Sequence, residues 1–212
     1  MKHLTLTALA GLLSLSAFGQ NRLVLVEHFT QASCGPCASQ NPALKVILDA
    51  NSTKVVALKY QTSWPGVDPM NAANPTEAAA RVQYYNVTGV PNSVMDGSGP
   101  GSPGTIVTAT TINNRYNTAA PLNITASHQW TPNYDSIQIG VFVANAGTTT
   151  VSSGAAGSLK LHVAVIEEEI NYPSAPGSNG EKDFYQVMRK MVPDASGTTM
   201  ADSWTAGQTQ MF

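Results

Sequence analysis

Two apolar runs flank a helix near the start of the chain. The first, residues 23–30, is rich in β-branched side chains, which is typical of a strand buried in a parallel sheet. Leu44, Ile47 and Leu48 then recur at helical spacing between Pro42 and Asn51. A second apolar run, residues 54–60, predicts another strand. The order strand, helix, strand is a βαβ unit, which predicts a parallel sheet.

The pattern continues through the first half of the chain. Asn74 and Pro75 are a good cap and first residue for a helix. The expected elements are a loop, a helix, a short strand and a last helix, at residues 62–74, 75–85, 93–96 and 105–117. We therefore expect an α/β domain over residues 20–118.

The pattern changes at residue 119 to short runs that alternate between apolar and polar residues. Three of these runs predict strands, at residues 122–126, 137–143 and 159–166. Residues 184–191 are compatible with a helix or an irregular crossover. Such spacing favours an all-β sandwich over residues 119–212. A sandwich has about seven strands, so three clear strands indicate an incomplete domain.

Residues 1–19 have the pattern of a secretory signal peptide. Lys2 and His3 precede an apolar run, and the small residues Ala17 and Gly19 suit cleavage before Gln20. The alternative is a membrane anchor, but the run is shorter than the roughly 20 residues of a spanning helix. We therefore expect an exported protein of the periplasm, the outer membrane or the extracellular space.

Charge excludes one class of partner. The formal net charge is −2 and only 11% of residues are charged. The sequence has no basic footprint for nucleic acid, so no nucleic-acid partner is expected.

The two cysteines, Cys34 and Cys37, are the only ones in the chain. A bond between residues so close closes a tiny ring and restrains the unfolded chain very little, which favours chemistry over a structural role. The alternative of a zinc site is weak, because Cys34, Cys37 and His28 would still lack a fourth ligand. We predict no metal and no cofactor.

A Cys-x-x-Cys pair at the start of a helix has a physical rationale. Unpaired N–H groups and the helix dipole favour a thiolate at Cys34, which then acts as the nucleophile. Cys37, one turn later, is placed to resolve the mixed disulfide. Gly35 allows another chain to approach, and Pro36 begins the helix without losing a donor.

These residues resemble thioredoxin. Val26-Glu27-His28-Phe29 before Cys34-Gly35-Pro36-Cys37 is similar to the family's first core strand and active turn, and Thr88-Gly89-Val90-Pro91 resembles its cis-proline loop. The resemblance implies that Val90 and Pro91 flank Cys34 and bind an extended substrate. The alternative is an ordinary loop, since trans bonds dominate before proline.

His28 takes the position at which the family has a buried acid. The resemblance implies that it accepts the proton of Cys37, and the alternative is a hydrogen-bonded histidine on the far side of the strand. Ser33 departs from the family, which has an aromatic residue before the first cysteine.

A second resemblance covers most of the chain. The signal peptide, Glu27-His28-Phe29-Thr30, Cys-Gly-Pro-Cys, Gly-Val-Pro and a later Arg189-Lys190-Met191-Val192 are similar to the Omp-twenty-eight-related outer-membrane proteins. This resemblance implies an exported bacterial surface protein in which a thioredoxin-like α/β domain precedes an all-β, immunoglobulin-like sandwich domain.

Two functions follow from this sequence. The first is a thiol–disulfide oxidoreductase whose partners are the thiols and disulfides of exported proteins. The second is a surface-associated binding or structural module, with a possible place at the outer membrane, whose dithiol is vestigial or redox-sensing.

Overall fold

The computed structural model describes residues 21–212, so the predicted signal peptide at residues 1–19 lies outside the described part. The first strand is β1 (Val24–Thr30), an interior strand of the main sheet whose residues are buried at all but one position. This continuous burial explains why the run is apolar without alternation, because both faces of the strand are covered. The prediction of a buried parallel strand there is confirmed.

The main sheet has five strands in the order β3-β1-β2-β9-β8. Strands β1 and β2 are parallel, as are β2 and β9, whereas β3 and β8 are antiparallel edge strands. The other four strands are β2 (Val55–Gln61), β3 (Asn92–Met95), β8 (Val163–Asn171) and β9 (Asp183–Val192).

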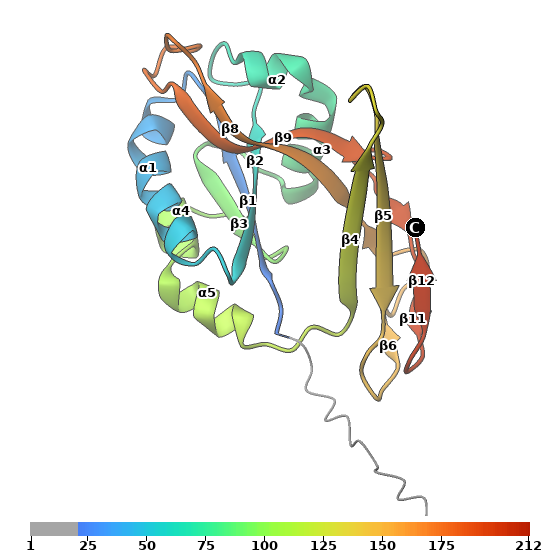
Figure 1. The fold of residues 1–212 in the computed structure, drawn as a ribbon. Helices are drawn as coiled ribbons and strands as arrows, with labels where there is room; N and C mark the ends of the chain where they lie inside the picture. Colours follow the sequence, from blue (N-terminus) through green and yellow to red (C-terminus); the bar gives the residue numbers. More distant parts are fainter. Residues whose placement is uncertain (1–20) are drawn as a thin grey trace, which may run out of the picture.

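Helices cover both faces of this sheet (Figure 1). One face carries α1 (Gly35–Ala50), α4 (Pro103–Ile106) and α5 (Ala109–Tyr116). The other face carries α2 (Pro69–Ala73) and α3 (Pro75–Tyr85). None of the helices within residues 21–212 has the length and apolar character needed to cross a membrane.

Helix α1 begins at Gly35 with Cys34 as its cap, as expected for a Cys-x-x-Cys pair at a helix start, and it thus extends seven residues before the apolar spacing that begins at Pro42. A later helix differs from its predicted bounds. The helix expected over residues 105–117 divides into α4 and α5 at Val107 and Thr108. There the Thr108 and Thr111 side chains form a capping box that starts a new helix.

Each face of the sheet has its own core. Leu44 and Leu48 of α1 pack with Val24 and Val26 of β1 and with Ile112 of α5. On the opposite face, Phe29 and Tyr60 stack with their ring centroids 5.2 Å apart and pack against α3. Alternate residues of β1 thus serve opposite faces, as the pleat of a strand requires.

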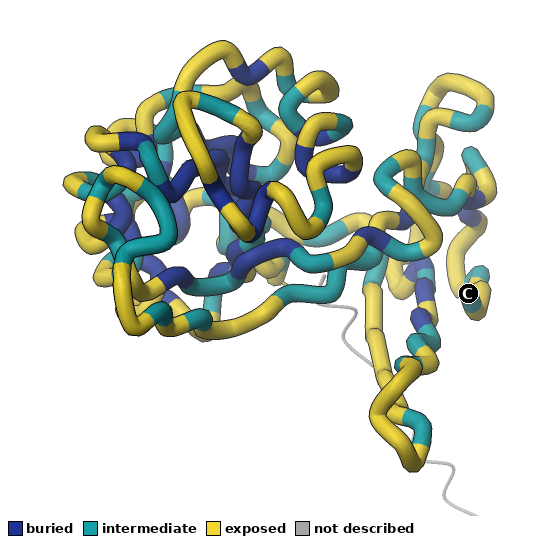
Figure 2. The backbone as a smooth tube through the Cα atoms, turned by 90° about the horizontal axis from the view of Figure 1, so that it is seen from above, coloured by how far each residue is buried: buried dark blue, intermediate teal, exposed yellow. Residues whose placement is uncertain are grey.

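The remaining strands form small antiparallel sheets beside this body. Strands β4 (Asn123–Trp130), β5 (Ile137–Ala144) and β12 (Thr209–Met211) make one sheet in the order β12-β5-β4. Strands β6 (Val151–Ser152) and β11 (Ser203–Trp204) make a second, and β7 (Lys160–Leu161) and β10 (Thr198–Thr199) a third. Their shared core contains Val143, Leu161 and Trp204. Figure 2 shows that burial concentrates in the α/β body, whereas β4 is exposed along nearly its whole length.

Strands β8 and β9 lie after residue 119 but join the first sheet rather than a separate sandwich. The expectation of a helix or crossover at residues 184–191 was therefore wrong, since this segment lies within β9. A contact between segments distant in sequence explains why residues 184–191 form a strand. The β8–β9 hairpin completes the sheet at the edge of β2, and Val187, Met188 and Met191 become core residues there.

One buried ion pair ties β1 to α3. Both oxygens of the Glu27 carboxylate accept hydrogen bonds. Arg81 Nη2 lies 2.7 Å from Glu27 Oε1, which also accepts from the Tyr60 hydroxyl. The Tyr85 hydroxyl donates to Oε2. Both charged side chains are less than a tenth exposed. Removing either Glu27 or Arg81 would leave the other charge buried in the core without a counter-ion.

Replacing Arg81 with Met is therefore expected to lower the free energy of unfolding by about 3 kcal/mol, because the carboxylate of Glu27 stays buried without its cation. Urea denaturation of wild type and R81M measures this. The control is R189M, which breaks an ion pair to Glu167 that is more than a third exposed at both ends. Its cost is expected to be below about 1 kcal/mol. Equal effects of the two substitutions would contradict the prediction.

Candidate redox site

Cys34 and Cys37 form a disulfide at the start of α1, with their Cα atoms 5.2 Å apart. Cys34 is the N-cap residue, in an extended conformation with φ −86° and ψ 108°. Its sulfur accepts a hydrogen bond from the backbone N–H of Cys37 at 3.1 Å. A sulfur in this position receives a donor and the positive end of the helix dipole, and both stabilise a thiolate after reduction.

Both cysteines are buried, whereas the two residues between them are exposed. Cys37 is fully buried and Cys34 is 2% exposed, while Gly35 and Pro36 lie at the surface. The disulfide is thus approached along the edge formed by Gly35 and Pro36. Gly35 has no side chain at this edge, so the backbone of another chain can come close to Cys34.

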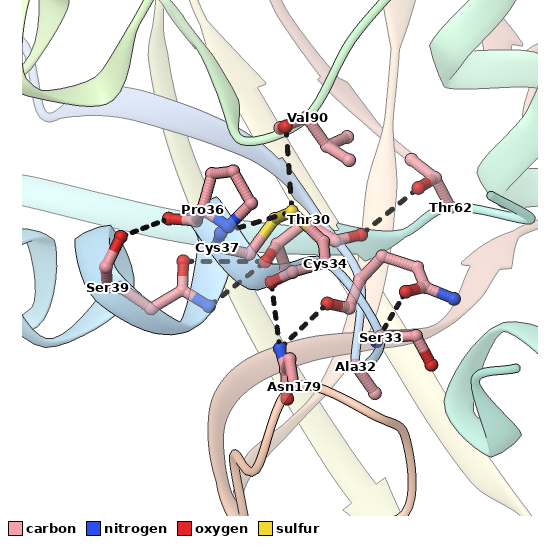
Figure 3. Close-up of a disulfide and its surroundings, with 12 residues drawn as sticks. Thr30, Ala32, Ser33, Cys34, Pro36, Cys37, Ser39, Thr62, Val90 and Asn179 are labelled. Atoms are coloured by element: carbon pink, nitrogen blue, oxygen red, sulfur yellow. Dashed lines mark hydrogen bonds between the residues drawn. A yellow bond between two sulfur atoms is a disulfide. The ribbon is translucent and has the colours of Figure 1, made fainter. Parts of the chain in front are cut away.

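Val90 lies beside the disulfide. The sulfur of Cys34 is 3.6 Å from the carbonyl oxygen of Val90 (Figure 3). The Val90–Pro91 peptide bond is cis. The pairing of β3 with β1 in the sheet puts the 88–91 loop here, since His28 is opposite Ser93. The structure therefore brings Cys34, Cys37, Val90 and Pro91 together.

His28 lies on the α1 side of β1, where it is fully buried. Its Nδ1 accepts from the Ser93 hydroxyl at 2.9 Å, and its Nε2 donates to Asn41 Oδ1 at 3.0 Å. This tautomer follows from Asn41, whose amide nitrogen already donates to Glu181 and Thr30, leaving its oxygen as the acceptor.

Burial, and secondarily the charge of Lys59, lower the pKa of His28 to about 3. The imidazole is therefore neutral at neutral pH, and its only lone-pair nitrogen is occupied by Ser93. These contacts favour a role for His28 in holding α1 against β1 and β3. They leave no free nitrogen to accept the proton of Cys37.

A loop distant in sequence completes the site. Asn179, between β8 and β9, donates its side-chain N–H groups to the carbonyl oxygen of Cys34 at 3.1 Å and to that of Gln31 at 3.3 Å. It also donates to Glu181 Oε2, while Glu181 Oε1 receives the amide of Asn41. No sequence pattern predicted a role for Asn41, Asn179 or Glu181, because nothing in their spacing links residue 34 to residue 179.

The same loop approaches the turn so closely that only glycine fits at residue 177. A Cβ there would lie 2.2 Å from the carbonyl oxygen of Ala32. Ser178 N–H also donates to the Ser33 hydroxyl, and Asn179 N–H to the Ala32 carbonyl. The backbone before Cys34 is thus held in place from the β8–β9 side. Within residues 21–212, no three His, Cys, Asp or Glu side chains are grouped so as to hold a metal ion.

Two solved structures are similar to this one. HBP35 of Porphyromonas gingivalis matches with a TM-score of 0.66 at 12% identity, over 91% of this chain and 64% of its own. Protein AGR_C_4864 from Agrobacterium tumefaciens matches with a TM-score of 0.53 at 14% identity, over 89% of this chain and 77% of its own. The fold is thioredoxin-like. This chain spans less than two thirds of the length of HBP35.

The likeness to these structures concerns the fold alone, because the identities are low. No protein-family model and no curated protein matches the sequence. The prediction of a thioredoxin-like α/β fold with additional β structure is confirmed at this level.

The packing around residue 33 explains why a serine replaces the aromatic residue that thioredoxin has at this position. Its hydroxyl donates to the carbonyl oxygen of Val67, and a Cβ on either Gly66 or Gly177 would collide with its side chain. Two loops thus enclose residue 33, and an aromatic side chain would not fit between them. The small residue is a consequence of the β8–β9 loop that packs against it.

The low pKa of His28 predicts a pH dependence of stability. Between about pH 6.5 and about pH 3 the unfolded chain binds a proton at His28 that the folded chain does not, so stability falls as pH decreases through this range. The slope from this group is at most about 1.4 kcal/mol per pH unit. The variant H28Q should lose this component, measured as its difference from wild type in urea denaturation at several pH values.

The matched control is His128, which is exposed on β4. H128Q should keep the slope of wild type. A slope unchanged in H28Q would show that the buried imidazole does not resist protonation.

Proposed function

We propose that this protein is an exported thiol–disulfide oxidoreductase. The observation that supports this most is the Cys34 sulfur, which accepts the Cys37 N–H in the first turn of α1 and lies 3.6 Å from the Val90 carbonyl oxygen. A sulfur stabilised as a thiolate and placed beside the backbone before a cis-proline suits attack on a disulfide held in an extended peptide.

The reaction is a pair of thiol–disulfide exchanges. In the reduced protein the Cys34 thiolate attacks one sulfur of a substrate disulfide, and the other sulfur leaves as a thiolate that takes up a proton. Cys37 then loses its proton and attacks the Cys34 sulfur, which releases the second substrate thiol. The protein dithiol is oxidised to a disulfide by two electrons and the substrate disulfide is reduced by two. The same steps in reverse oxidise a substrate dithiol.

The positions of the two cysteines support their separate roles. Cys34 lies next to the exposed Gly35–Pro36 edge, and its sulfur receives the stabilising N–H group. Cys37 is fully buried within the first turn of α1 and is bonded to the Cys34 sulfur. Gly35 and Pro36 form the edge along which the substrate lies, and Val90 and Pro91 form the opposite side.

Export to the periplasm, the outer membrane or the extracellular space is part of the proposal, and it rests on the signal-peptide pattern at residues 1–19. Disulfides persist in those compartments, so partners with thiols and disulfides are present there. The relation to Omp-twenty-eight-related proteins and an immunoglobulin-like character of the small sheets are proposed on the motifs alone.

A specific observation favours the second candidate function, a surface-associated binding module. Strand β4 is an edge strand with no Asp, Glu, Lys, Arg or Pro, and Ile124 and Trp130 on it are 56% and 46% exposed. Edge strands are usually protected by charges or proline, so an unprotected edge suits pairing with another chain.

Two single substitutions separate these functions. In the proposed enzyme, C34S should lower the rate of reduction of a fluorescent disulfide-linked peptide by on the order of 100-fold or more, because the nucleophile is lost. C37S should instead accumulate a mixed disulfide with the peptide through Cys34, because the resolving thiol is missing. Stopped-flow fluorescence measures the first effect, and intact-protein mass spectrometry detects the second.

Serine at either position keeps the size of the side chain, so both variants should retain the wild-type circular dichroism spectrum. If wild type, C34S and C37S react equally with the peptide and no adduct forms, the dithiol is not an enzyme site and the binding module becomes the better proposal.

A further inference from the structure

A cavity of about 560 Å³ lies between the dithiol helix and β9, and neither cysteine lines it. Helix α1 forms one wall through Asn41 and Lys45, and the end of the β8–β9 loop with the start of β9 forms the other through Glu181 and Tyr185. Strand β2 adds Lys59 and Gln61. The volume is within the range of small-molecule sites.

Lys59 lines this cavity with a charge that has no direct partner among the described residues. The residue is 4% exposed, and its Nζ makes neither a hydrogen bond nor an ion pair within residues 21–212. Its neighbour on β1 is His28, which is neutral, and the centroid of the Tyr185 ring is 5.8 Å from Nζ. Burial lowers the pKa of Lys59 to about 8, which reflects the cost of holding an ammonium there.

Gln61 lines the same cavity two residues later and is 3% exposed. Its amide nitrogen and its amide oxygen are both buried, and neither has a hydrogen-bond partner within the described residues. Unpaired buried polar groups are rare in folded proteins, and a functional ligand is one of the few reasons for them.

Because alternate residues of a strand face the same way, Lys59 and Gln61 lie on one face of β2, about 7 Å apart along it. A cation and an amide at this spacing can bind a carboxylate and a neighbouring hydrogen-bonding group. Tyr185 offers an aromatic surface between Lys59 and Lys45, whose Nζ atoms lie 5.8 Å and 4.4 Å from its ring centroid.

We propose that this cavity is a binding site for a small organic acid, with its carboxylate on Lys59 and an adjacent amide or carbonyl group on Gln61. Three other charged residues line the cavity beside Lys45 and Lys59, and they are Glu181, Lys182 and Asp183. Glu181 already favours the ammonium of Lys59 from a distance, and the two carboxylates disfavour a second negative charge, so the ligand is a monoanion. Lys45 does not compete for the carboxylate, since it is paired with Asp49 at 2.6 Å. This site is distinct from the disulfide and does not depend on redox activity.

N-acetylglycine is the test probe, because it carries one carboxylate and one amide. Its neutral analogue, N-acetylglycinamide, is the matched ligand control. Titrating each into the full-length ¹⁵N-labelled protein should shift amide signals of residues 59–61 and 181–185 with N-acetylglycine only. The expected dissociation constant is about 1 mM, as for a fragment of this size.

Replacing Lys59 with Met keeps the length of the side chain and is expected to weaken binding of N-acetylglycine at least tenfold. Q61L should weaken it as well, which gives a second variant if K59M fails to fold. The control is K45M, on the rim of the same cavity, which should change the affinity less than threefold.

Three results would overturn the proposal. They are equal binding of the neutral analogue, unchanged affinity in both K59M and Q61L, and no shift in the cavity signals up to about 50 mM N-acetylglycine, well above the expected millimolar constant. Because the assay reads binding and not thiol chemistry, loss of redox activity in C34S would leave its outcome unchanged.

Discussion

A chain of hydrogen bonds, buried at His28 and partly buried at Glu181 and Asn179, holds the dithiol in position. It runs from Ser93 through His28 and Asn41 to Glu181, and from there through Asn179 to the carbonyl of Cys34. Its members come from β3, β1, α1 and the β8–β9 loop, so it joins four segments that are far apart in sequence. Inside a protein such a network is stabilising only when every group has a partner, and here each named link does. The helix that carries both cysteines is thereby fixed against the sheet.

This network requires the β8–β9 hairpin to return to the sheet. The return has a second consequence, because the hairpin also closes the cavity over Lys59 and Gln61. Glu181 takes part in both features. Burial raises its pKa, while its hydrogen bonds to Asn41 and Asn179 act in the opposite direction. One loop therefore enforces a small side chain at residue 33, holds the backbone of the active turn, and walls a pocket behind it.

The enclosure of the turn also shapes the proposed chemistry. In the proposed reaction the substrate approaches along the exposed Gly35–Pro36 edge, beside the Val90 carbonyl. Both nitrogens of His28 are hydrogen-bonded, so the proposed reaction does not use His28 as the proton acceptor of Cys37. The site thus combines a thioredoxin-like dithiol with an environment that the C-terminal half of the chain supplies.

The sequence by itself determined the features that depend on neighbouring residues. The continuous apolar run of β1, the Cys-Gly-Pro-Cys turn at a helix start and the loop before Pro91 are local patterns, and each predicted its element. Tertiary structure alone decided that β8 and β9 join the first sheet, because β alternation in residues 163–192 says which faces are apolar but not which edge they pair with. It also decided the partners of His28 and the unpaired state of Lys59 and Gln61. Those depend on burial and on contacts between segments distant in the chain, such as His28 with Ser93 65 residues later and β2 with the 180–185 segment, for which no spacing pattern exists.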